Sequence, residues 1–424
     1  MTQFPRMAVA IQQFDRTKVQ STDAALAQTF AEAEFSTLPL QGKKIAVAVG
    51  SRGISSIAAI VKNTVETLKR AGAIPFVIPA MGSHGGGTEA GQAGLLANYG
   101  VASDRIGAPV DASLETVPLG ETPDGVPVYI ARSAWQADGV ILINRIKPHT
   151  DFHGDFESGL MKMIAIGLGK IHGANAFHSR THLFPSSEMI RSIARVVLAQ
   201  GKVLGGVAIL ENAYHETARL EWVPASRMEE REKVLLPEAK KLMPSLPVEK
   251  ADILLIDEIG KNISGTGLDP NITGRCYRLN SVWQEKPDIT RIVALDLTDD
   301  SHGNAVGIGL TDFCHRRIVD KMDRMATYLN AIISRNTPNA AIPMYYDNSR
   351  ELLEHVMLSI GESVRPEQMR LLRIRNTLDI ERILVSEALV PELRNHPQIA
   401  SLSELREMEF DSRGDLIELR RMNF

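Results

Sequence analysis

Residues 139–178 read GVILINRIKPHTDFHGDFESGLMKMIAIGLGKIHGANAFH, and they join a short apolar run to a loop rich in histidine and glycine. The apolar run, Gly139–Ile143, has the composition of a strand that is buried on both faces. The rest, Lys147–His178, holds four of the chain's eleven histidines and five glycines. In α/β proteins, strand ends that open into glycine-rich loops are where chemistry is placed. The stretch therefore predicts an α/β fold and the position of its reactive site.

The same order of strand, glycine loop and helix occurs twice upstream. Lys44–Val49 is typical of a buried strand and ends in GSRG at 50–53, before apolar residues at helical spacing over Ile57–Ala71. Ile74–Ile78 is typical of a second strand, and it runs into MGSHGGG at 81–87. Strands that alternate with helices at such short intervals favour a parallel sheet.

Prolines and charged residues mark a boundary between two domains. Residues 224–248 combine four prolines with the charged run Arg227–Lys233, as a surface helix and a linker would. A second α/β unit begins with ADILLI at 251–256 and continues through a polar glycine loop, Asp257–Arg275. We therefore predict two α/β domains, residues 1–248 and 249–424, with an active-site cleft between them. Whether the last residues return to the first domain is left open.

Length and composition narrow the class of protein. A chain of 424 residues with 44% hydrophobic and 23% charged residues is typical of a globular protein with more than one core. The net charge of −4 gives no reason to expect nucleic acid and favours a small or anionic metabolite as the partner. Two cysteines exclude a disulfide framework, and the sequence shows neither a signal peptide nor an apolar run of membrane length. We expect a cytoplasmic protein without a membrane partner, and leave homo-oligomerisation open.

Several polar side chains in these loops are candidates for chemistry. Lys162 lies in the apolar run LMKMI at 160–164, where desolvation would lower the pKa of its amine and make it a nucleophile. The ordinary alternative is a lysine whose stem packs while its ammonium group reaches water. His84 lies in a loop of glycines, where its ring either meets a ligand or has no role. Arg52 and Arg275 fit carboxylate clamps or ordinary surface charges.

Two standard motifs are only partly matched. GLGKI at 167–171 has isoleucine where a Walker motif needs Ser or Thr for magnesium, which disfavours an NTPase. His178 and His182 would share one face of a helix, but Ser179 stands where a metalloprotease needs glutamate. A zinc-dependent hydrolase or lyase that uses these two histidines is kept as an alternative.

Taken in this order, the motifs resemble the nickel-dependent lactate racemase family of 2-hydroxyacid racemases and epimerases. The resemblance covers most of the chain and is strongest over residues 44–92 and 139–182. SRG at 51–53 is similar to the loop whose arginine, here Arg52, binds the substrate carboxylate. GSH at 82–84 and PH at 148–149 are similar to the segments that carry two acid/base histidines, here His84 and His149. His153 is a rival for the second role, because the segment that follows His149 is slightly longer than in lactate racemase.

The resemblance also implies a cofactor and a reaction. SGLMK at 158–162 is similar to the family's SGGxK stretch, in which the lysine, here Lys162, attaches covalently to a nickel-pincer nucleotide. His178 falls where the family places its nickel-ligating histidine, and the enzymes that mature the cofactor are then partners. The implied reaction inverts C2 of a 2-hydroxycarboxylate by removal and return of a hydride, while histidines move the hydroxyl proton.

The second domain bears on the substrate. DPN at 269–271 is similar to the family's DxN stretch, but the glutamine and lysine expected after it are absent, and Arg275 is our candidate there for a substrate contact. Loop 257–275 is rich in Asn, Ser and Thr, which predicts a polar substrate such as a sugar acid, because each buried group left unpaired costs about 1–3 kcal/mol. Turn chemistry explains the same composition. A non-catalytic hydroxyacid-binding protein is the third hypothesis.

Overall fold

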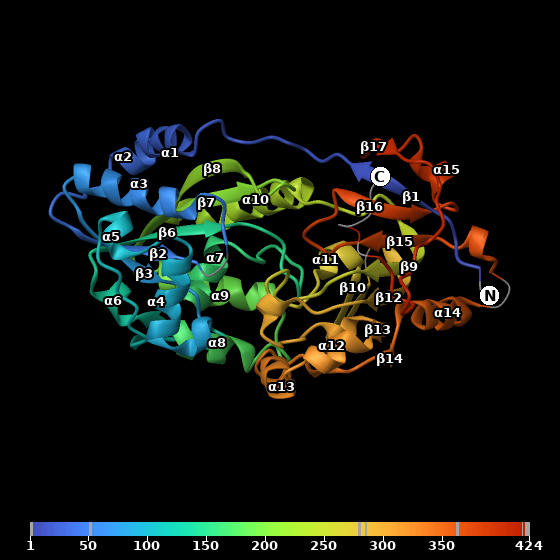
Figure 1. The fold of residues 1–424 in the computed structure, drawn as a ribbon. Helices are drawn as coiled ribbons and strands as arrows, with labels where there is room; N and C mark the ends of the chain where they lie inside the picture. The colour runs from blue at the N-terminus through green and yellow to red at the C-terminus, as the bar shows by residue number, and fades with distance from the viewer. Residues whose placement is uncertain are drawn as a thin grey trace. The chain divides into compact units, whose positions relative to one another are not determined.

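The computed structural model describes residues 3–50, 53–278, 281–284, 286–361, 364–417 and 419 (Figure 1). The chain divides into two compact units, an N-terminal unit of Asp15–Met243 and a C-terminal unit that combines Met1–Phe14 with Pro244–Phe424. The sequence had assigned residues 1–14 to the first domain. They belong to the C-terminal unit because β1 (Met7–Gln12) pairs antiparallel with two strands of that unit's sheet.

The N-terminal unit is built on a five-stranded sheet with the strand order β3-β2-β6-β7-β8. The strands are β2 (Lys44–Val49), β3 (Ile74–Pro79), β6 (Gly139–Arg145), β7 (Val203–Glu211) and β8 (Thr217–Pro224). The first four in the sheet run parallel, and β8 runs antiparallel to β7. The apolar runs at 44–49, 74–78 and 139–143 therefore form the predicted parallel strands.

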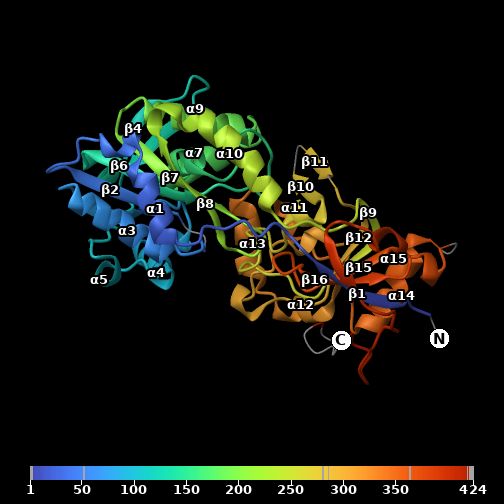
Figure 2. The ribbon, with the colours of Figure 1, turned by 90° about the horizontal axis from the view of Figure 1, so that it is seen from above.

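Apolar helix faces cover both sides of this sheet, which explains why the central parts of its parallel strands are apolar. On one side, Ile141 and Ile143 pack with α1 (Thr22–Ala31) and α3 (Ile57–Arg70). On the other, Val140 and Leu142 pack with α7 (Leu160–Lys162), α9 (Ser186–Leu198) and α10 (Met228–Leu242). Figure 2 shows α1 and α3 on one side of the strands and α7 and α9 on the other.

The remaining elements of this unit are short helices and one hairpin, apart from a helix of ten residues after β3. They are α2 (Ala33–Ser36), α4 (Glu89–Asn98), α5 (Ser103–Ile106), β4 (Thr116–Glu121), β5 (Pro127–Ala131), α6 (Arg132–Gln136) and α8 (Lys170–His178).

The C-terminal unit has an eight-stranded mixed sheet with the order β14-β13-β12-β9-β15-β16-β1-β17. The strands β9, β12, β13, β14 and β15 are parallel, and β16, β1 and β17 continue the sheet in antiparallel pairs. The ADILLI run lies in β9, at the centre. Together with the first sheet, this confirms the predicted α/β class.

The bounds of these strands are β9 (Lys250–Ile256), β12 (Asp288–Ala294), β13 (Phe313–His315), β14 (Met344–Tyr346), β15 (Leu371–Ile374), β16 (Arg382–Ser386) and β17 (Ile399–Leu402). A separate hairpin joins β10 (Arg275–Arg278) to β11 (Ser281–Gln284). The helices are α11 (Pro270–Thr273), α12 (Arg316–Lys321), α13 (Arg324–Ile333), α14 (Ser349–Ile360) and α15 (Val390–Leu393).

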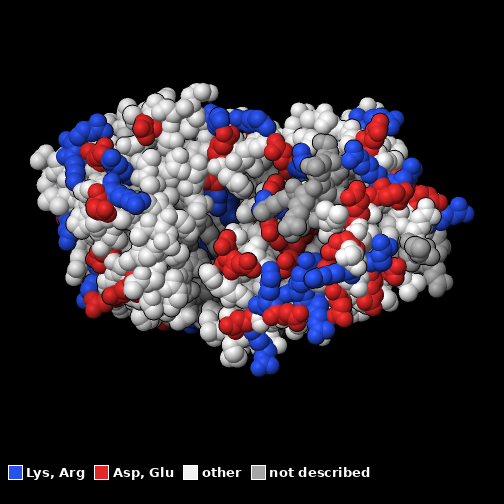
Figure 3. Space-filling model, in the orientation of Figure 1, with Lys and Arg blue, Asp and Glu red and all other residues white. Residues whose placement is uncertain are grey.

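Charged side chains of both signs lie beside one another over the face of the C-terminal unit drawn in Figure 3. Several charged side chains of this unit are paired, such as Arg316 with Asp347 and Arg370 with Glu392. Among the described residues, no helix combines the length and the apolar character needed to cross a membrane.

Candidate active site

The loops that carry the predicted site residues leave one edge of the N-terminal sheet. Because β2, β3 and β6 are parallel and in register, Val49, Pro79 and Ile143 end side by side, and the loops that follow begin together. The Gly82 N–H donates to the Gly167 carbonyl (3.4 Å), which links the loop after β3 to the segment between Lys162 and His178. Arg52, the predicted carboxylate clamp in the loop after β2, lies outside the described residues.

The loop after β3 holds His84 at the surface. His84 is exposed and is followed by three glycines, Gly85–Gly87, whose φ values of 68°, 66° and 65° disfavour any residue with a side chain. From beneath, the buried amide of Gln92 on α4 donates to the carbonyls of Gly82 (2.8 Å) and His84 (3.3 Å). The loop backbone is thus fixed while the imidazole is accessible to a ligand.

The loop after β6 folds around a buried carboxylate, that of Glu157. This side chain is 0% exposed and accepts hydrogen bonds from the His149 N–H (2.7 Å) and from Lys240 Nζ on α10 (2.6 Å). Its Oε1 also lies 3.3 Å from His153 Nδ1. Burial alone would raise the pKa of Glu157, but hydrogen bonds from His153, Lys240 and His149 outweigh it and hold the pKa below the usual value. A charged Glu157 therefore positions both candidate histidines.

The His149 ring has a defined tautomer. Its Nδ1 accepts the Asp151 N–H (3.0 Å), and the ring stacks on Phe152 with centroids 4.2 Å apart. A ring nitrogen that accepts from a backbone amide carries no proton, so the neutral ring holds its proton on Nε2. In this state His149 presents a proton donor at Nε2, whereas His153 directs Nδ1 to Glu157.

Lys162 is the last residue of the three-residue helix α7. It is half-buried among buried apolar neighbours, with Nζ 5.8 Å from the centroid of the Phe152 ring. The helix start is held by Asn144 of β6, whose Nδ2 donates to the Gly159 carbonyl (2.8 Å). After Lys162 the chain makes one π-helical turn, Met163–Gly167, a form of helix that is frequent at functional sites.

His178 ends α8, and this corrects one premise of the zinc alternative. His178 is half-buried with its ring edge against Phe177, and the helix stops there. Residues 179–183 form turns, so the exposed His182 does not share a helical face with His178. Across the described ranges, no three His, Cys, Asp or Glu side chains are grouped as a metal site made of protein ligands alone would require.

One buried lysine beside the site was not singled out as a functional residue from the sequence. Lys170 is 0% exposed, adopts a φ of 51°, and donates from Nζ to the Pro79 carbonyl (2.7 Å), where β3 ends. Burial lowers the pKa of Lys170 to about 8, although the negative charges of Asp111 and Glu89 raise it in part. The only signal in the sequence was a lysine between small and apolar residues.

The predicted role of Arg275 assumed that this residue follows the end of a strand, but it does not. It begins β10, and its guanidinium donates to Asp312 (2.6 Å) and to the Ile289 carbonyl (2.9 Å). Both partners lie where β13 and β12 begin, and the Arg275 side chain is only 11% exposed. These contacts join Arg275 to the protein, and a substrate carboxylate would have to displace Asp312.

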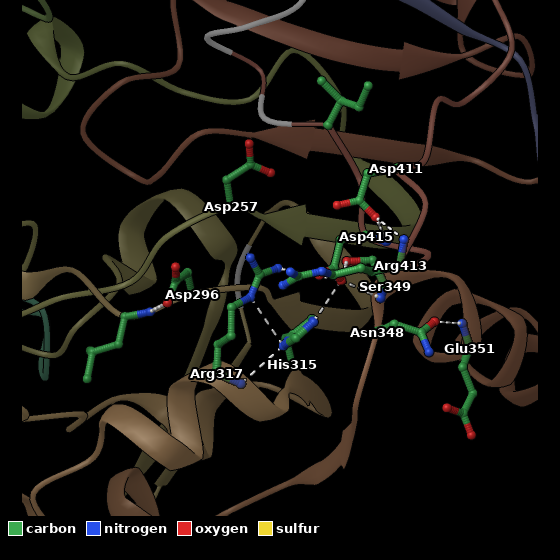
Figure 4. A network of polar contacts seen from close by, with 12 residues as sticks. Asp257, Asp296, His315, Arg317, Asn348, Ser349, Glu351, Asp411, Arg413 and Asp415 are labelled. Carbon is green, nitrogen blue, oxygen red and sulfur yellow. Dashed lines mark hydrogen bonds and ion pairs between the residues drawn. The ribbon is translucent and has the colours of Figure 1, made fainter.

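Polar side chains gather where the parallel strands of the C-terminal unit end (Figure 4). His315, the last residue of β13, points toward Asp415, with Nε2 2.9 Å from Oδ1. The same oxygen accepts from the backbone N–H (3.1 Å) and the hydroxyl (3.2 Å) of Ser349. Asp257, which follows β9, accepts from the buried guanidinium of Arg373 (2.7 Å). The contacts with His315 and Ser349 hold Asp415 at this edge of the sheet.

Much of the polar loop 257–275 is satisfied internally. Ser264 and Thr266 are buried and lie 3.1 Å apart through their hydroxyl groups, and Thr266 donates to the Leu268 carbonyl (2.7 Å). Asn262 accepts from the Thr298 hydroxyl (2.6 Å). The argument from unpaired groups therefore does not apply to these three side chains, and turn chemistry accounts for them.

The fold and the site define a two-unit α/β protein with its candidate reactive groups at the carboxyl edge of a parallel sheet. Residues 7–189 match the family model described as the lactate racemase N-terminal domain. The lactate racemase apoprotein from Thermoanaerobacterium thermosaccharolyticum has a similar fold, with a TM-score of 0.52 and 12% identity over 84% of this chain and 96% of that chain. No curated protein matches the sequence significantly. The two matches confirm the predicted resemblance to the lactate racemase family.

Proposed function

We propose that the protein is a racemase or epimerase that inverts C2 of a 2-hydroxycarboxylate with a nickel-pincer nucleotide attached through Lys162. The observation that carries the proposal is the single segment that runs from Lys162 to His178 and is hydrogen bonded to the His84 loop through Gly82 and Gly167. The match of residues 7–189 to the lactate racemase N-terminal domain model supports the racemase class. A cytoplasmic location and cofactor-maturation enzymes as partners belong to the same proposal.

The side chains at this edge fit such a cofactor. Lys162 offers a primary amine for covalent attachment, and His178 offers an imidazole for nickel. Since the described residues form no group of three protein ligands, a metal bound here would take its other ligands from a bound organic group. Of the three glycines after His84, Gly86 leaves the backbone open to such a group, since a Cβ added there would meet nothing within 4 Å. When bound, the nickel cofactor supplies reversible acceptance of a hydride.

The remaining roles follow from the chemistry of the substrate. The C2 hydrogen of a 2-hydroxycarboxylate is a poor acid because the neighbouring carboxylate already carries negative charge, so loss of a hydride is the easier route. Inversion then needs an acid/base group on each side of the carbon, and we assign these roles to His84 and His149. The Nε2 proton of neutral His149 supports its role as a donor to a carbonyl oxygen. Arg52 is assigned to the carboxylate.

The substrate proposed is polar, such as a sugar acid epimerised at C2. Comparing lactate with a panel of aldonates, by chiral separation of the products, tests it directly.

The cofactor is tested by co-expressing the chain with nickel and the enzymes that make the cofactor. We expect a nucleotide-sized mass increase that maps to Lys162 and is lost, with activity, in Lys162→Ala. Lys202→Ala is the matched control and should keep the adduct. An unmodified chain, made beside a known racemase that is modified, would remove the cofactor from the proposal.

Two further outcomes separate the alternatives. His182→Ala should retain activity and metal, whereas loss of stoichiometric zinc in that variant would favour the zinc-dependent hydrolase or lyase. Tight binding of a hydroxyacid that survives His84→Ala, with no turnover in the loaded wild-type protein, would favour a non-catalytic binding protein.

A further inference from the structure

A second buried carboxylate, that of Glu232 on α10, lies directly beneath the helix that carries Lys162. Glu232 is 1% exposed, and its Oε2 accepts the Met161 N–H (2.9 Å). The Leu160 N–H also faces the carboxylate. A Cβ built at Gly159 would lie 2.4 Å from Oε1, so this close approach depends on glycine at position 159.

No cation neutralises Glu232 among the charged groups described around it. The neighbouring cations on α10 are engaged elsewhere, since Lys233 pairs with Asp155 and Lys240 with Glu157. The elements packed against α10 carry five charged residues among those described: Lys162, Glu211, Arg219, Glu221 and Arg227. Glu211 pairs with Arg145, Arg219 pairs with Glu221, and Arg227 pairs with Glu34. Burial without a counter-charge raises the pKa of Glu232 to about 7, although the two backbone N–H groups act in the opposite direction.

Burying the Glu232 carboxylate without a counter-charge costs free energy, and the place where it is buried indicates its role. Among the described residues Oε1 has no hydrogen-bond partner, and the N–H groups that face the carboxylate are those of the first turn of α7. The first N–H groups of α7 have no acceptor within the helix, so they need an acceptor from elsewhere. An acidic side chain at a helix start supplies one.

We propose that Glu232 is a positioning residue for Lys162, holding the start of α7 from the α10 side while Asn144 holds Gly159 from the sheet. Its importance for catalysis rests on the proposed attachment at Lys162. The positioning itself concerns the unmodified chain and is tested there.

The test compares Glu232→Met, which removes the acceptor, with Glu232→Gln, which keeps an oxygen in its place. Glu230→Met on the exposed side of the same helix is the matched control. Two readouts are taken on the full-length unmodified protein: amide hydrogen exchange of peptides that cover residues 159–163, and acylation of Lys162 relative to Lys202 by peptide mass spectrometry.

We expect Glu232→Met to raise the exchange rate of the Met161 amide at least tenfold and to change the relative acylation of Lys162 at least threefold. Glu232→Gln at pH 6 and Glu230→Met should match the wild type in both. Unchanged exchange and acylation in a folded Glu232→Met protein would overturn the proposal.

A second comparison decides the matter if Glu232→Met does not fold. Because glutamine does not ionise, the wild type should show a step in relative Lys162 acylation between pH 6 and pH 8 that Glu232→Gln lacks. Identical profiles would overturn the proposal, since a group that only fills space would not alter them. Neither readout requires the cofactor, so a failure of the proposed function would be seen separately, as a wild-type chain without an adduct.

Discussion

Replacing Lys170 by methionine should change how the stability of the N-terminal unit depends on pH. Lys170 is 0% exposed, and burial lowers its pKa from 10.5 to about 8. Between these values the unfolded chain binds a proton that the folded protein has released, so the wild type becomes more stable as the pH rises. Since one pKa unit corresponds to about 1.36 kcal/mol, the gain is about 2–3 kcal/mol between pH 7 and pH 10. Methionine does not titrate and lacks this gain.

Two effects oppose each other at pH 7. Methionine removes the cost of burying an ammonium group but leaves the Pro79 carbonyl without its donor, which costs about 1–3 kcal/mol. We expect similar unfolding free energies at pH 7, and a wild type that is more stable by about 2–3 kcal/mol at pH 10.

Urea unfolding at pH 7, 8, 9 and 10, followed by circular dichroism, measures this difference. Lys202→Met is the control, because Lys202 also donates to a backbone carbonyl, that of Ala137 (2.9 Å), but from a half-buried position. A difference between wild type and Lys170→Met that stays constant from pH 7 to pH 10 would refute the reasoning.

Three more substitutions test the buried charges. Arg373→Leu leaves the Asp257 carboxylate buried without its partner, and should lower the free energy of unfolding by roughly 3–5 kcal/mol in urea. Asp415→Asn should destabilise the protein more at pH 7 than at pH 3. Burial alone would raise the pKa of Asp415, but its hydrogen bonds hold it below the usual value, so the stabilisation exists above the ordinary carboxyl pKa and disappears as the pH falls. Glu157→Gln should lower turnover at least tenfold in a racemisation assay with little change in KM, because the loop that carries His149 loses its charged anchor.

For each of these three substitutions, a control variant or a contradicting outcome can be named. Removing Asp257 together with Arg373 should recover part of the lost stability, and a single-mutant loss below about 1 kcal/mol would contradict a buried ion pair. Calorimetric stability curves that run parallel from pH 3 to pH 7 would contradict the account of Asp415. Asp155→Asn, in the same loop but exposed, should leave turnover unchanged.

The sequence predicted the central strands because their apolar runs are local. Val47 and Ile141 lie in strands covered on both sides, whose runs 45–49 and 139–143 are entirely apolar, and ends marked by glycine are visible in a few residues. The strand β1 was not predicted. MAVAIQ at 7–12 has a fitting composition, but its partners are residues 382–386 and 399–402, and no local pattern shows a pairing across the whole chain.

The roles of the site residues stay predictions. The loops of His84 and His149 do leave one edge of the parallel sheet, at the glycine-rich strand ends where the sequence had placed the chemistry. The groups that support them were missed, because their roles depend on contacts between distant elements. Glu232 belongs to the charged run 227–233, which by composition is a solvated helix face, yet its side chain is almost completely buried. Arg275 was placed from its loop, and only the fold reveals Asp312 beside it.

Because the C-terminal unit is discontinuous in sequence, it limits the order in which the two units can fold during synthesis. Val9 hydrogen bonds to Ser403, 394 positions later, so the first strand emerges long before anything can pair with it. Residues 15–243 are complete by then and can fold first, as N-terminal segments generally do during synthesis. The two ends of the polypeptide join last, and the nascent first strand, with its unpaired edge, is the segment that most needs protection by a chaperone until synthesis ends.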